Sequence, residues 1–285
     1  MSSQSARGER LAAALPKRYA FREQIGKGGA AYVVLADDLE RQHPVAIKIL
    51  RPEIATAVGE TRFHREIEIL RHLEHPNILP LLDYGSVGEL ILYFTMPFVD
   101  GITLQTRLRR EQRLPLGDSI SIAADVAGAL DYAHGRGIIH RDIKPANILL
   151  SDGRVIVADF GIARAMAVDS AEQITISGVS LGTPEYMSPE QVEAMRELDA
   201  RCDVYALGCV MYEMLSGEPP FTGPTELAIF ARHVNEEPRS IRVVHPEIPA
   251  GVDAAIIKAL QKSRAARFYT AGAFAKALLL PGSAD

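Results

Sequence analysis

The sequence predicts an α+β fold in two lobes, a small β-rich lobe followed by a larger, mainly helical one. Strand-like apolar runs at 45–50 and 90–95 surround one helical pattern in the first part of the chain, which is typical of a small sheet with one packed helix. Beyond about residue 101 the apolar residues recur mostly at helical spacing. The chain has 285 residues, 47% of them hydrophobic, so it can bury a substantial core in one large domain or two compact lobes.

The charge balance argues against a protein built to bind polyanions. The 31 Lys and Arg are outnumbered by 36 Asp and Glu, for a net charge of −5, so a nucleic acid or an anionic membrane would need a local basic patch. The most basic stretch, 107–113, has no interleaved aromatic residues and is better interpreted as a solvated helix face. We therefore expect no nucleic-acid partner and no membrane contact within this chain.

Cysteine usage and hydropathy indicate a cytoplasmic location. Cys202 and Cys209 stand seven positions apart in an apolar, helical run, where a disulfide is geometrically difficult, so we expect two buried thiols. The apolar run 11–15 is too short for a signal-peptide core, and no apolar run reaches the about 18 residues of a membrane span. The sequence leaves open whether the chain is a whole protein or the catalytic part of a longer, membrane-anchored one.

Along the chain, the elements are expected in this order. Residues 1–18 are mainly polar and are interpreted as a leader for which no order is assumed, so the first lobe begins at residue 19. In the second lobe, apolar residues recur at helical spacing over 120–133, and this helix is expected to stop near Gly135. The run 203–215 is apolar nearly all round, which predicts a helix buried at the centre of the second lobe.

Residues 26–33 read GKGGAAYV, a glycine-rich turn between two strand-like segments. The missing Cβ atoms let backbone N–H groups approach a phosphate. Ordinary hairpin turns have a similar composition, so this motif alone is a weak indication of phosphate binding.

The next motif, VAIK at 45–48, places a small residue and a cation on one face of a strand. Alternation sends Ala46 and Lys48 to the same side. On the following helical pattern, Glu66 lies within the angular width of the apolar stripe. Burying that carboxylate unpaired would be costly, so we expect a Lys48–Glu66 ion pair. The alternatives are a surface lysine and a solvated glutamate at the helix edge.

The strongest motif is HRDIKPANILL at 140–150, followed by SDGR and then VIVADFG. Asp-Gly at 152–153 is a hairpin turn signal between two short apolar strands. If 148–150 pairs with 155–158, Asn147 and Asp159 flank the open end of the hairpin, and their oxygen atoms converge on one hard cation, for which Mg²⁺ is the natural candidate. Asp142 is then placed to accept a proton from an attacking hydroxyl, and Lys144 to neutralise phosphate charge. The alternative, a polar loop before a structural hairpin, fits these spacings less well.

Seven motifs in this order resemble those of the eukaryotic-like protein kinases. They are the glycine turn, VAIK, a helix Glu, HRDxKxxN, DFG, GTPEYMSPE and DVYALG. The resemblance covers about residues 19–280 and is strongest to the bacterial Ser/Thr protein kinases. It implies a bilobal protein-kinase fold with an N-lobe at 19–96, a hinge at 97–101, a C-lobe at 102–280 and a tail at 281–285. Lys144 and the substrate-docking Thr183 resemble the Ser/Thr branch.

The resemblance also implies a role for each motif residue. Lys48 would hold the α and β phosphates of ATP, with Glu66 fixing it. Asp159 would bind Mg²⁺ and Asn147 a second one, with Mn²⁺ as the alternative metal. Asp142 would deprotonate the substrate hydroxyl, and Lys144 would stabilise the transferring phosphoryl group.

The expected ATP site includes the glycine turn and an apolar pocket for adenine. The members from the glycine turn are Ile25, Gly26, Lys27, Gly28 and Gly29. The residues expected to line the adenine are Val33, Ala46 and Leu149, with Met96 as gatekeeper. The hinge contributes Pro97, Phe98 and Val99. Pro97 lacks an N–H but keeps its carbonyl, which is all that the first hinge residue offers in related kinases.

Two positions depart from the family pattern. Ala31 stands where a third glycine is usual, which restricts φ and affects loop closure more than nucleotide binding. Ser188 replaces the usual alanine before Pro189. Glu190 is retained, and the resemblance implies a structural ion pair between Glu190 and Arg267.

The segment 165–181 is polar and carries several hydroxyl residues, which is consistent with a mobile activation segment. Thr175 and Ser177 match the phosphoacceptor positions of similar bacterial kinases. Arg141 and Arg164 would bind a phosphate there, with Arg62 as a third cation or simply a solvated charge.

The resulting hypothesis is an ATP- and Mg²⁺-dependent Ser/Thr kinase that acts on protein substrates and autophosphorylates on its activation segment. An activating homodimer is left open. The first alternative is a pseudokinase, a nucleotide-binding scaffold with the same fold, but all five residues whose loss usually marks a dead site are present. A small-molecule phosphotransferase ranks last, because it would not be expected to carry the GTPEYMSPE segment.

Overall fold

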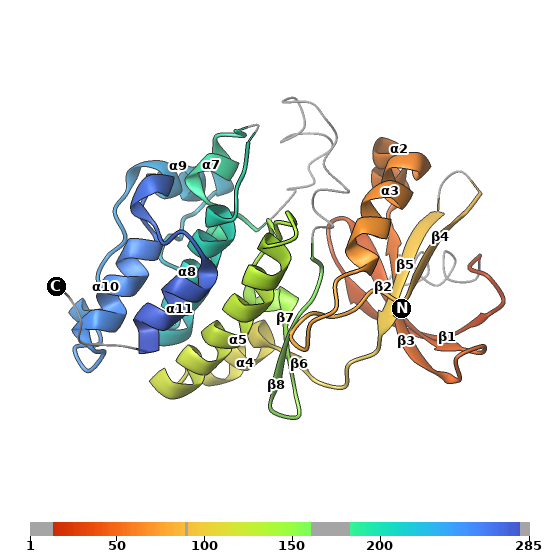
Figure 1. Ribbon diagram of the computed structural model, residues 1–285, viewed down its shortest axis with the longest axis horizontal. Coiled ribbons are helices and arrows are strands. Elements are labelled where there is room, and N and C mark those ends of the chain that lie inside the picture. Colours follow the sequence, from red (N-terminus) through yellow and green to blue (C-terminus); the bar gives the residue numbers. More distant parts are fainter. Residues whose placement is uncertain (1–13, 89–90, 161–182, 196, 280–285) are drawn as a thin grey trace. The chain divides into compact units, whose positions relative to one another are not determined.

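The structure is a computed structural model and describes residues 14–88, 91–160, 183–195 and 197–279. These residues form two compact units (Figure 1). The first unit contains 14–74 and 79–100, and the second contains 75–78, 101–160 and the described residues from 183 onward. Each unit is described by itself below.

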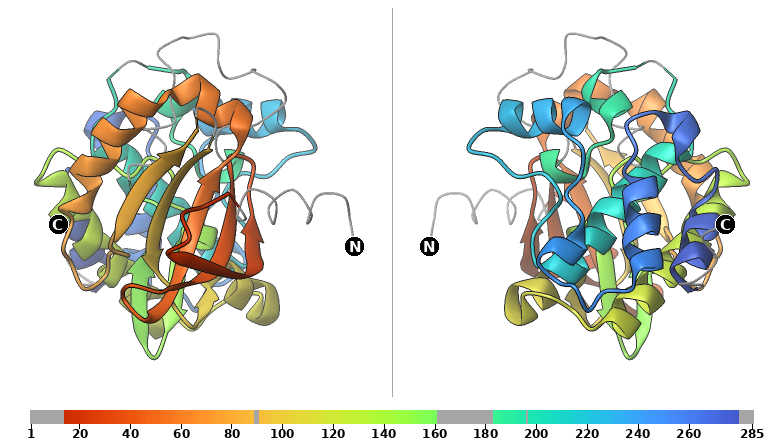
Figure 2. Two further views of the ribbon diagram at one scale, coloured as in Figure 1. Left: turned by 90° about the vertical axis from the view of Figure 1, so that its right-hand side faces the viewer. Right: turned by 90° about the vertical axis from the view of Figure 1, so that its left-hand side faces the viewer.

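The first unit is built on one antiparallel sheet with two helices. Its five strands lie side by side in the order β1-β2-β3-β5-β4 (Figure 2, left). The strands are β1 (Tyr19–Lys27), β2 (Ala31–Asp38), β3 (His43–Leu50), β4 (Asp83–Val87) and β5 (Ile91–Pro97), and the helices that follow β3 are α2 (Pro52–Val58) and α3 (Glu60–Arg71). This matches the expected small sheet with a packed helix, and α2 adds a short helix before it.

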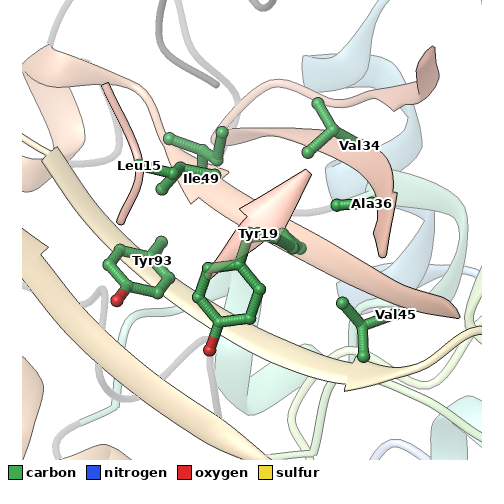
Figure 3. Close-up of a cluster of buried hydrophobic side chains, with 8 residues drawn as sticks. Leu15, Tyr19, Val34, Ala36, Val45, Ile49 and Tyr93 are labelled. Atoms are coloured by element: carbon green, nitrogen blue, oxygen red, sulfur yellow. The ribbon is translucent and has the colours of Figure 1, made fainter. Parts of the chain in front are cut away.

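An apolar cluster covers one face of this sheet (Figure 3). Tyr19 and Tyr93 meet edge to face, with ring centroids 6.0 Å apart. Leu15 is buried in the same cluster, and Arg18 donates to the carboxylates of Asp38 at 2.7 Å and Asp83 at 2.9 Å. The leader expected over 1–18 was therefore drawn too long, because its last residues belong to the core and its ion pairs.

The second unit is mainly helical, with a small sheet at 102–157. The strands β6 (Ile102–Thr103), β7 (Ile148–Ser151) and β8 (Arg154–Val157) pair in the order β6-β7-β8. The helices are α4 (Leu104–Glu111), α5 (Leu116–His134), α7 (Pro189–Val192), α8 (Arg201–Ser216), α9 (Glu226–Asn235), α10 (Ala250–Ala259) and α11 (Ala271–Leu279), and single 3-10 turns lie at Pro145–Asn147, Pro184–Tyr186, Ile241–Val243 and Arg264–Ala266.

The two helices expected from periodicity are α5 and α8. Most of α8 is buried, as its continuous apolar sequence predicts. Cys202 and Cys209 lie on it as buried free thiols. None of the described helices is both long and apolar enough to span a membrane.

One short segment of the expected N-lobe packs with the other unit. Residues 75–78 belong to the second unit, because the Asn77 side chain donates to the Val155 carbonyl at 2.8 Å and the Asn77 carbonyl accepts from Val157 N–H at 2.8 Å. Hydrogen bonds from one asparagine to a distant strand leave no periodic signal in the sequence, so periodicity could not assign this segment.

Candidate active site

The β7–β8 hairpin has the geometry that the sequence predicted. Ile148 pairs with Val157 and Ser151 with Arg154, and the turn residues Asp152 and Gly153 have φ of 48° and 74°, the left-handed values that an Asp-Gly turn supplies. At the open end, Ala158 N–H donates to the Asn147 carbonyl at 2.9 Å. Asn147 therefore lies beside Ala158, the residue directly before Asp159.

Asp142 lies against both of its expected neighbours. Its carboxylate accepts from Lys144 Nζ at 2.8 Å and from Asn147 Nδ2 at 3.0 Å. Asn147 Nδ2 also donates to the Asp142 carbonyl at 2.8 Å. Because the amide nitrogen is committed to Asp142, the amide oxygen is the atom that Asn147 offers to a cation.

The backbone around these groups is held in an unusual conformation. Arg141 and Asp159 have φ of 69° and 64°, which is uncommon for residues other than glycine and clusters at functional sites. The buried carboxylate of Asp203 accepts from the backbone N–H groups of His140 and Arg141, both at 2.8 Å. On the other side, Gln191 Nε2 donates to the Arg141 carbonyl at 2.8 Å. The strained turn is thus fixed from two helices, α8 and α7.

Asp203 and His140 connect the parts of this turn. Burial would raise the pKa of Asp203, but hydrogen bonds from His134 and from the His140 backbone outweigh it and lower the pKa. The buried His140 ring accepts from Asp142 N–H through Nδ1 at 3.2 Å, which leaves Nε2 to donate to the Ala158 carbonyl at 2.9 Å. One ring therefore ties the loop of Asp142 to the strand end before Asp159.

Thr183 precedes the 3-10 turn at Pro184–Tyr186 and is half-buried. Tyr186 on that turn donates to Glu213 of α8 at 2.6 Å, and burial raises the pKa of both groups. The following residues are also fixed, since Ser188 and Gln191 form a capping box at the start of α7. The segment expected to dock substrate is thus held firmly on the second unit.

The first unit gathers its expected ATP-site residues on one face of the sheet. In the antiparallel register Val33 stands opposite Lys48, and Ala46 stands opposite Met96. Directly opposed residues share a face, as do residues two apart on a strand, so these four side chains share one face. Gly26 lies beside Val33, where an added Cβ would stand 3.2 Å from the Val33 Cβ. Within the glycine-rich segment 26–33, the turn itself spans 28–30, joins β1 to β2 and is closed by Gly28 N–H donating to the Ala31 carbonyl at 2.9 Å.

The remaining expected residues occupy separate places. Pro97 ends β5, Val99 follows it, and Leu149 lies on β7 of the second unit. Glu66 is buried on α3 and accepts from Arg65 at 2.9 Å. The Lys48–Glu66 ion pair stays a prediction. The expected phosphoacceptors Thr175 and Ser177 lie outside the described residues, as do Arg164 and the glycine of DFG.

Comparison with known proteins settles the family. The sequence model of the protein kinase domain family matches residues 19–271 of this chain. The chain belongs to the protein kinase family. The serine/threonine-protein kinase PknB of Mycobacterium tuberculosis is 41% identical over 262 residues, which are 90% of this chain and 42% of that protein. A probable serine/threonine-protein kinase of Streptomyces coelicolor is 40% identical, over 89% of this chain and 38% of its own length.

Solved structures agree with the fold. The crystal structure of the Mycobacterium tuberculosis PknI kinase domain has a TM-score of 0.72 and 30% identity, covering 92% of this chain and 96% of that one. The chain spans less than half the length of the curated relatives described above. The resemblance to bacterial Ser/Thr kinases and the α+β kinase fold are thereby confirmed.

The sequence motifs included DVYALG but did not indicate what its aspartate does. A signal was present, since Asp203 lies in the first turn of a helix that is otherwise apolar nearly all round. A carboxylate buried there requires hydrogen-bond donors. The polar HRD turn at 140–142 supplies two of them.

Proposed function

We propose that this chain is an ATP-dependent protein kinase domain that transfers the γ-phosphoryl group to Ser and Thr hydroxyls. The observation that carries the proposal is the constellation of Asp142, Lys144 and Asn147, fixed by His140 and Asp203. In this constellation the Asp142 carboxylate, the proposed general base, lies beside the positively charged Lys144. The scaffold alternative predicts the loss of at least one of five residues, and all five are present: Lys48, Glu66, Asp142, Asn147 and Asp159.

The donor set fits a hard divalent cation. Asn147 offers an amide oxygen and Asp159 a carboxylate, and oxygen ligands of this kind suit Mg²⁺. A bound Mg²⁺ would neutralise charge on the ATP phosphates. Mn²⁺ is accommodated by the same ligands.

Proton transfer and ATP binding are assigned to side chains of this chain. Asp142 accepts the proton of the attacking hydroxyl. Lys144, which holds the Asp142 carboxylate at 2.8 Å, also supplies positive charge for the transferring group. Lys48 binds the α and β phosphates, with Glu66 as its partner, and the face formed by Val33, Ala46 and Met96 receives the adenine together with Leu149.

The proposal extends to regulation and location. Thr175 and Ser177 are autophosphorylation sites, and Arg141 and Arg164 order the phosphorylated segment. Thr183 contacts the protein substrate. The domain acts in the cytoplasm, alone or within a longer protein, and sizing with and without nucleotide tests whether it forms a homodimer.

Phosphoamino-acid analysis tests the activity directly. A generic protein substrate with Ser, Thr and Tyr acceptors is incubated with the chain, ATP and Mg²⁺. The proposal expects phosphoserine and phosphothreonine without phosphotyrosine. If ADP binds with Mg²⁺ but no phosphate is transferred even after forced dimerisation, the scaffold alternative is correct instead.

A further inference from the structure

Arg51, the residue that follows β3, contacts the glycine turn at two points. Its backbone N–H donates to the Ala30 carbonyl at 2.9 Å. Its guanidinium donates through Nη2 to the Gly28 carbonyl at 2.7 Å. The second bond is charge-assisted, and such bonds are shorter and stronger than neutral ones. One residue thus binds two carbonyls of the three-residue turn 28–30.

The guanidinium itself is held by an aromatic ring. It lies over Tyr32, with its central carbon 5.3 Å from the ring centroid, a distance at which a cation is attracted to the ring face. Tyr32 is buried and is paired with Ile49 in the β2–β3 ladder. The charged group is therefore positioned by the sheet.

The backbone of Arg51 is anchored as well. It is the N-cap of α2, and its carbonyl accepts from the N–H groups of Ile54 at 2.9 Å and Ala55 at 2.8 Å. Pro52 begins the helix, which suits its fixed φ and missing N–H. The glycine turn is thus attached to the end of β3 and the start of α2.

We propose that Arg51 is a positioning residue for the nucleotide phosphates. A carbonyl and the N–H of the next residue point in opposite directions across one planar peptide. Because Arg51 holds the Gly28 carbonyl, the Gly29 N–H points away from Arg51 and is pre-oriented to meet a phosphate oxygen. This inference rests on the proposed function, in which the glycine turn binds ATP.

The test compares ligands with and without phosphate. Dissociation constants of Mg²⁺-ADP and of adenosine are measured by calorimetry for the wild type, Arg51→Ala and Arg51→Lys. If positioning of the turn is worth about one ordinary hydrogen bond to phosphate binding, Arg51→Ala weakens Mg²⁺-ADP about five- to tenfold and adenosine less than about twofold. Arg51→Lys keeps one donor without the planar group, so its loss for Mg²⁺-ADP is intermediate.

Two further variants keep the test decisive. Arg22→Ala removes a surface arginine on β1 that pairs with Asp37, and it should bind both ligands as the wild type does. Tyr32→Leu removes the ring under the guanidinium and should weaken Mg²⁺-ADP more than adenosine, which tests the inference even if Arg51→Ala fails to fold.

The outcomes separate this inference from the proposed function. Equal losses for ADP and adenosine, or unchanged ADP binding in Arg51→Ala, overturn the role of Arg51 alone. Failure of the wild type to bind either ligand overturns the proposed function together with the inference.

Discussion

At the scale of single residues, Asp142 is the group on which the proposed phosphoryl transfer depends most. Asp142→Asn preserves the shape of the side chain but removes the acceptor for the hydroxyl proton. We expect kcat to fall by about 10²- to 10⁴-fold, with Mg²⁺-ADP affinity unchanged. Initial rates and calorimetry measure the two quantities.

The matched control is Asp152→Asn, in the exposed turn of the same hairpin. Asparagine tolerates the positive φ of that position, so the rate should remain that of the wild type. Equal rates for Asp142→Asn and the wild type would exclude Asp142 as the base.

His233 on α9 is predicted to make stability depend on pH. It is fully buried, and burial, together with the positive charge of Lys262, lowers its pKa to about 3 although the carbonyls of Glu185 and Pro184 favour the charged form. Below about pH 6.5 the unfolded chain therefore binds a proton that the folded chain does not, and the free energy of unfolding falls as the pH falls toward 3.

Denaturant unfolding of wild type and His233→Gln at two pH values checks this. The stability advantage of the wild type should be smaller at pH 5 than at pH 7 by about 1 to 2 kcal/mol. His72→Gln, at the exposed position that follows the end of α3, is the control. A wild-type advantage that is the same at both pH values would contradict the prediction.

The sequence indicated the candidate catalytic residues more directly than the contacts that hold them. Asp142, Asn147 and Asp159 follow from a hairpin whose turn and strands are local in sequence. The bonds from Asp203 join residues more than sixty positions apart. Long-range hydrogen bonds of this kind leave no periodicity, so only the three-dimensional fold reveals them.

At the scale of elements, the buried Glu190–Arg267 ion pair joins α7 to the segment before α11. The bonds are 2.7 and 2.8 Å long, and both side chains are almost fully buried, which bears out the pairing implied by the family resemblance. Arg267→Met would leave an uncompensated buried carboxylate, so we expect a loss of about 3 to 5 kcal/mol in the free energy of unfolding.

Arg264→Met is the control for this variant. Arg264 pairs with Asp199 at 3.3 Å, and both groups are substantially exposed, so its loss should cost at most about 1 kcal/mol. Similar urea midpoints for the two variants would contradict the assignment of Arg267 as a structural residue.

The last of the described helices, α11, is attached to α5 by a carboxylate. Asp131 accepts from the N–H groups of Ala271 and Gly272, each at 3.0 Å, which satisfies two donors at the start of α11. Asp131→Ala should therefore lower the free energy of unfolding by about 0.5 to 2 kcal/mol. Chemical denaturation measures this loss. A free energy of unfolding within about 0.3 kcal/mol of the wild type would contradict the prediction and show that water replaces the carboxylate without cost.

The sequence predicted the helices and strands well where apolar periodicity was strong. Residues 120–133 and 203–215 lie within α5 and α8. The leader was drawn too long because the short apolar run 11–15 carries no sign that Leu15 packs against the sheet. The segment 75–78 was assigned to the first lobe by its neighbours, whereas the hydrogen bonds of Asn77 place it with the second unit.

At the scale of the whole molecule, the residues that the proposed reaction needs come from both units. Lys48 and Glu66 belong to the first unit, and Asp142, Asn147 and Asp159 to the second. Neither unit carries the complete set, so loss of either Lys48 or Asp142 should strongly slow the transfer.

Intact mass after incubation with ATP and Mg²⁺ tests the central claim most directly, since it needs no knowledge of the natural substrate. The wild type should gain phosphate that maps to Thr175 or Ser177, and Lys48→Met and Asp142→Asn should gain far less in the same time. Phosphate gained equally by the wild type and Asp142→Asn, or no gain by the wild type at any protein concentration, would contradict the proposed kinase activity.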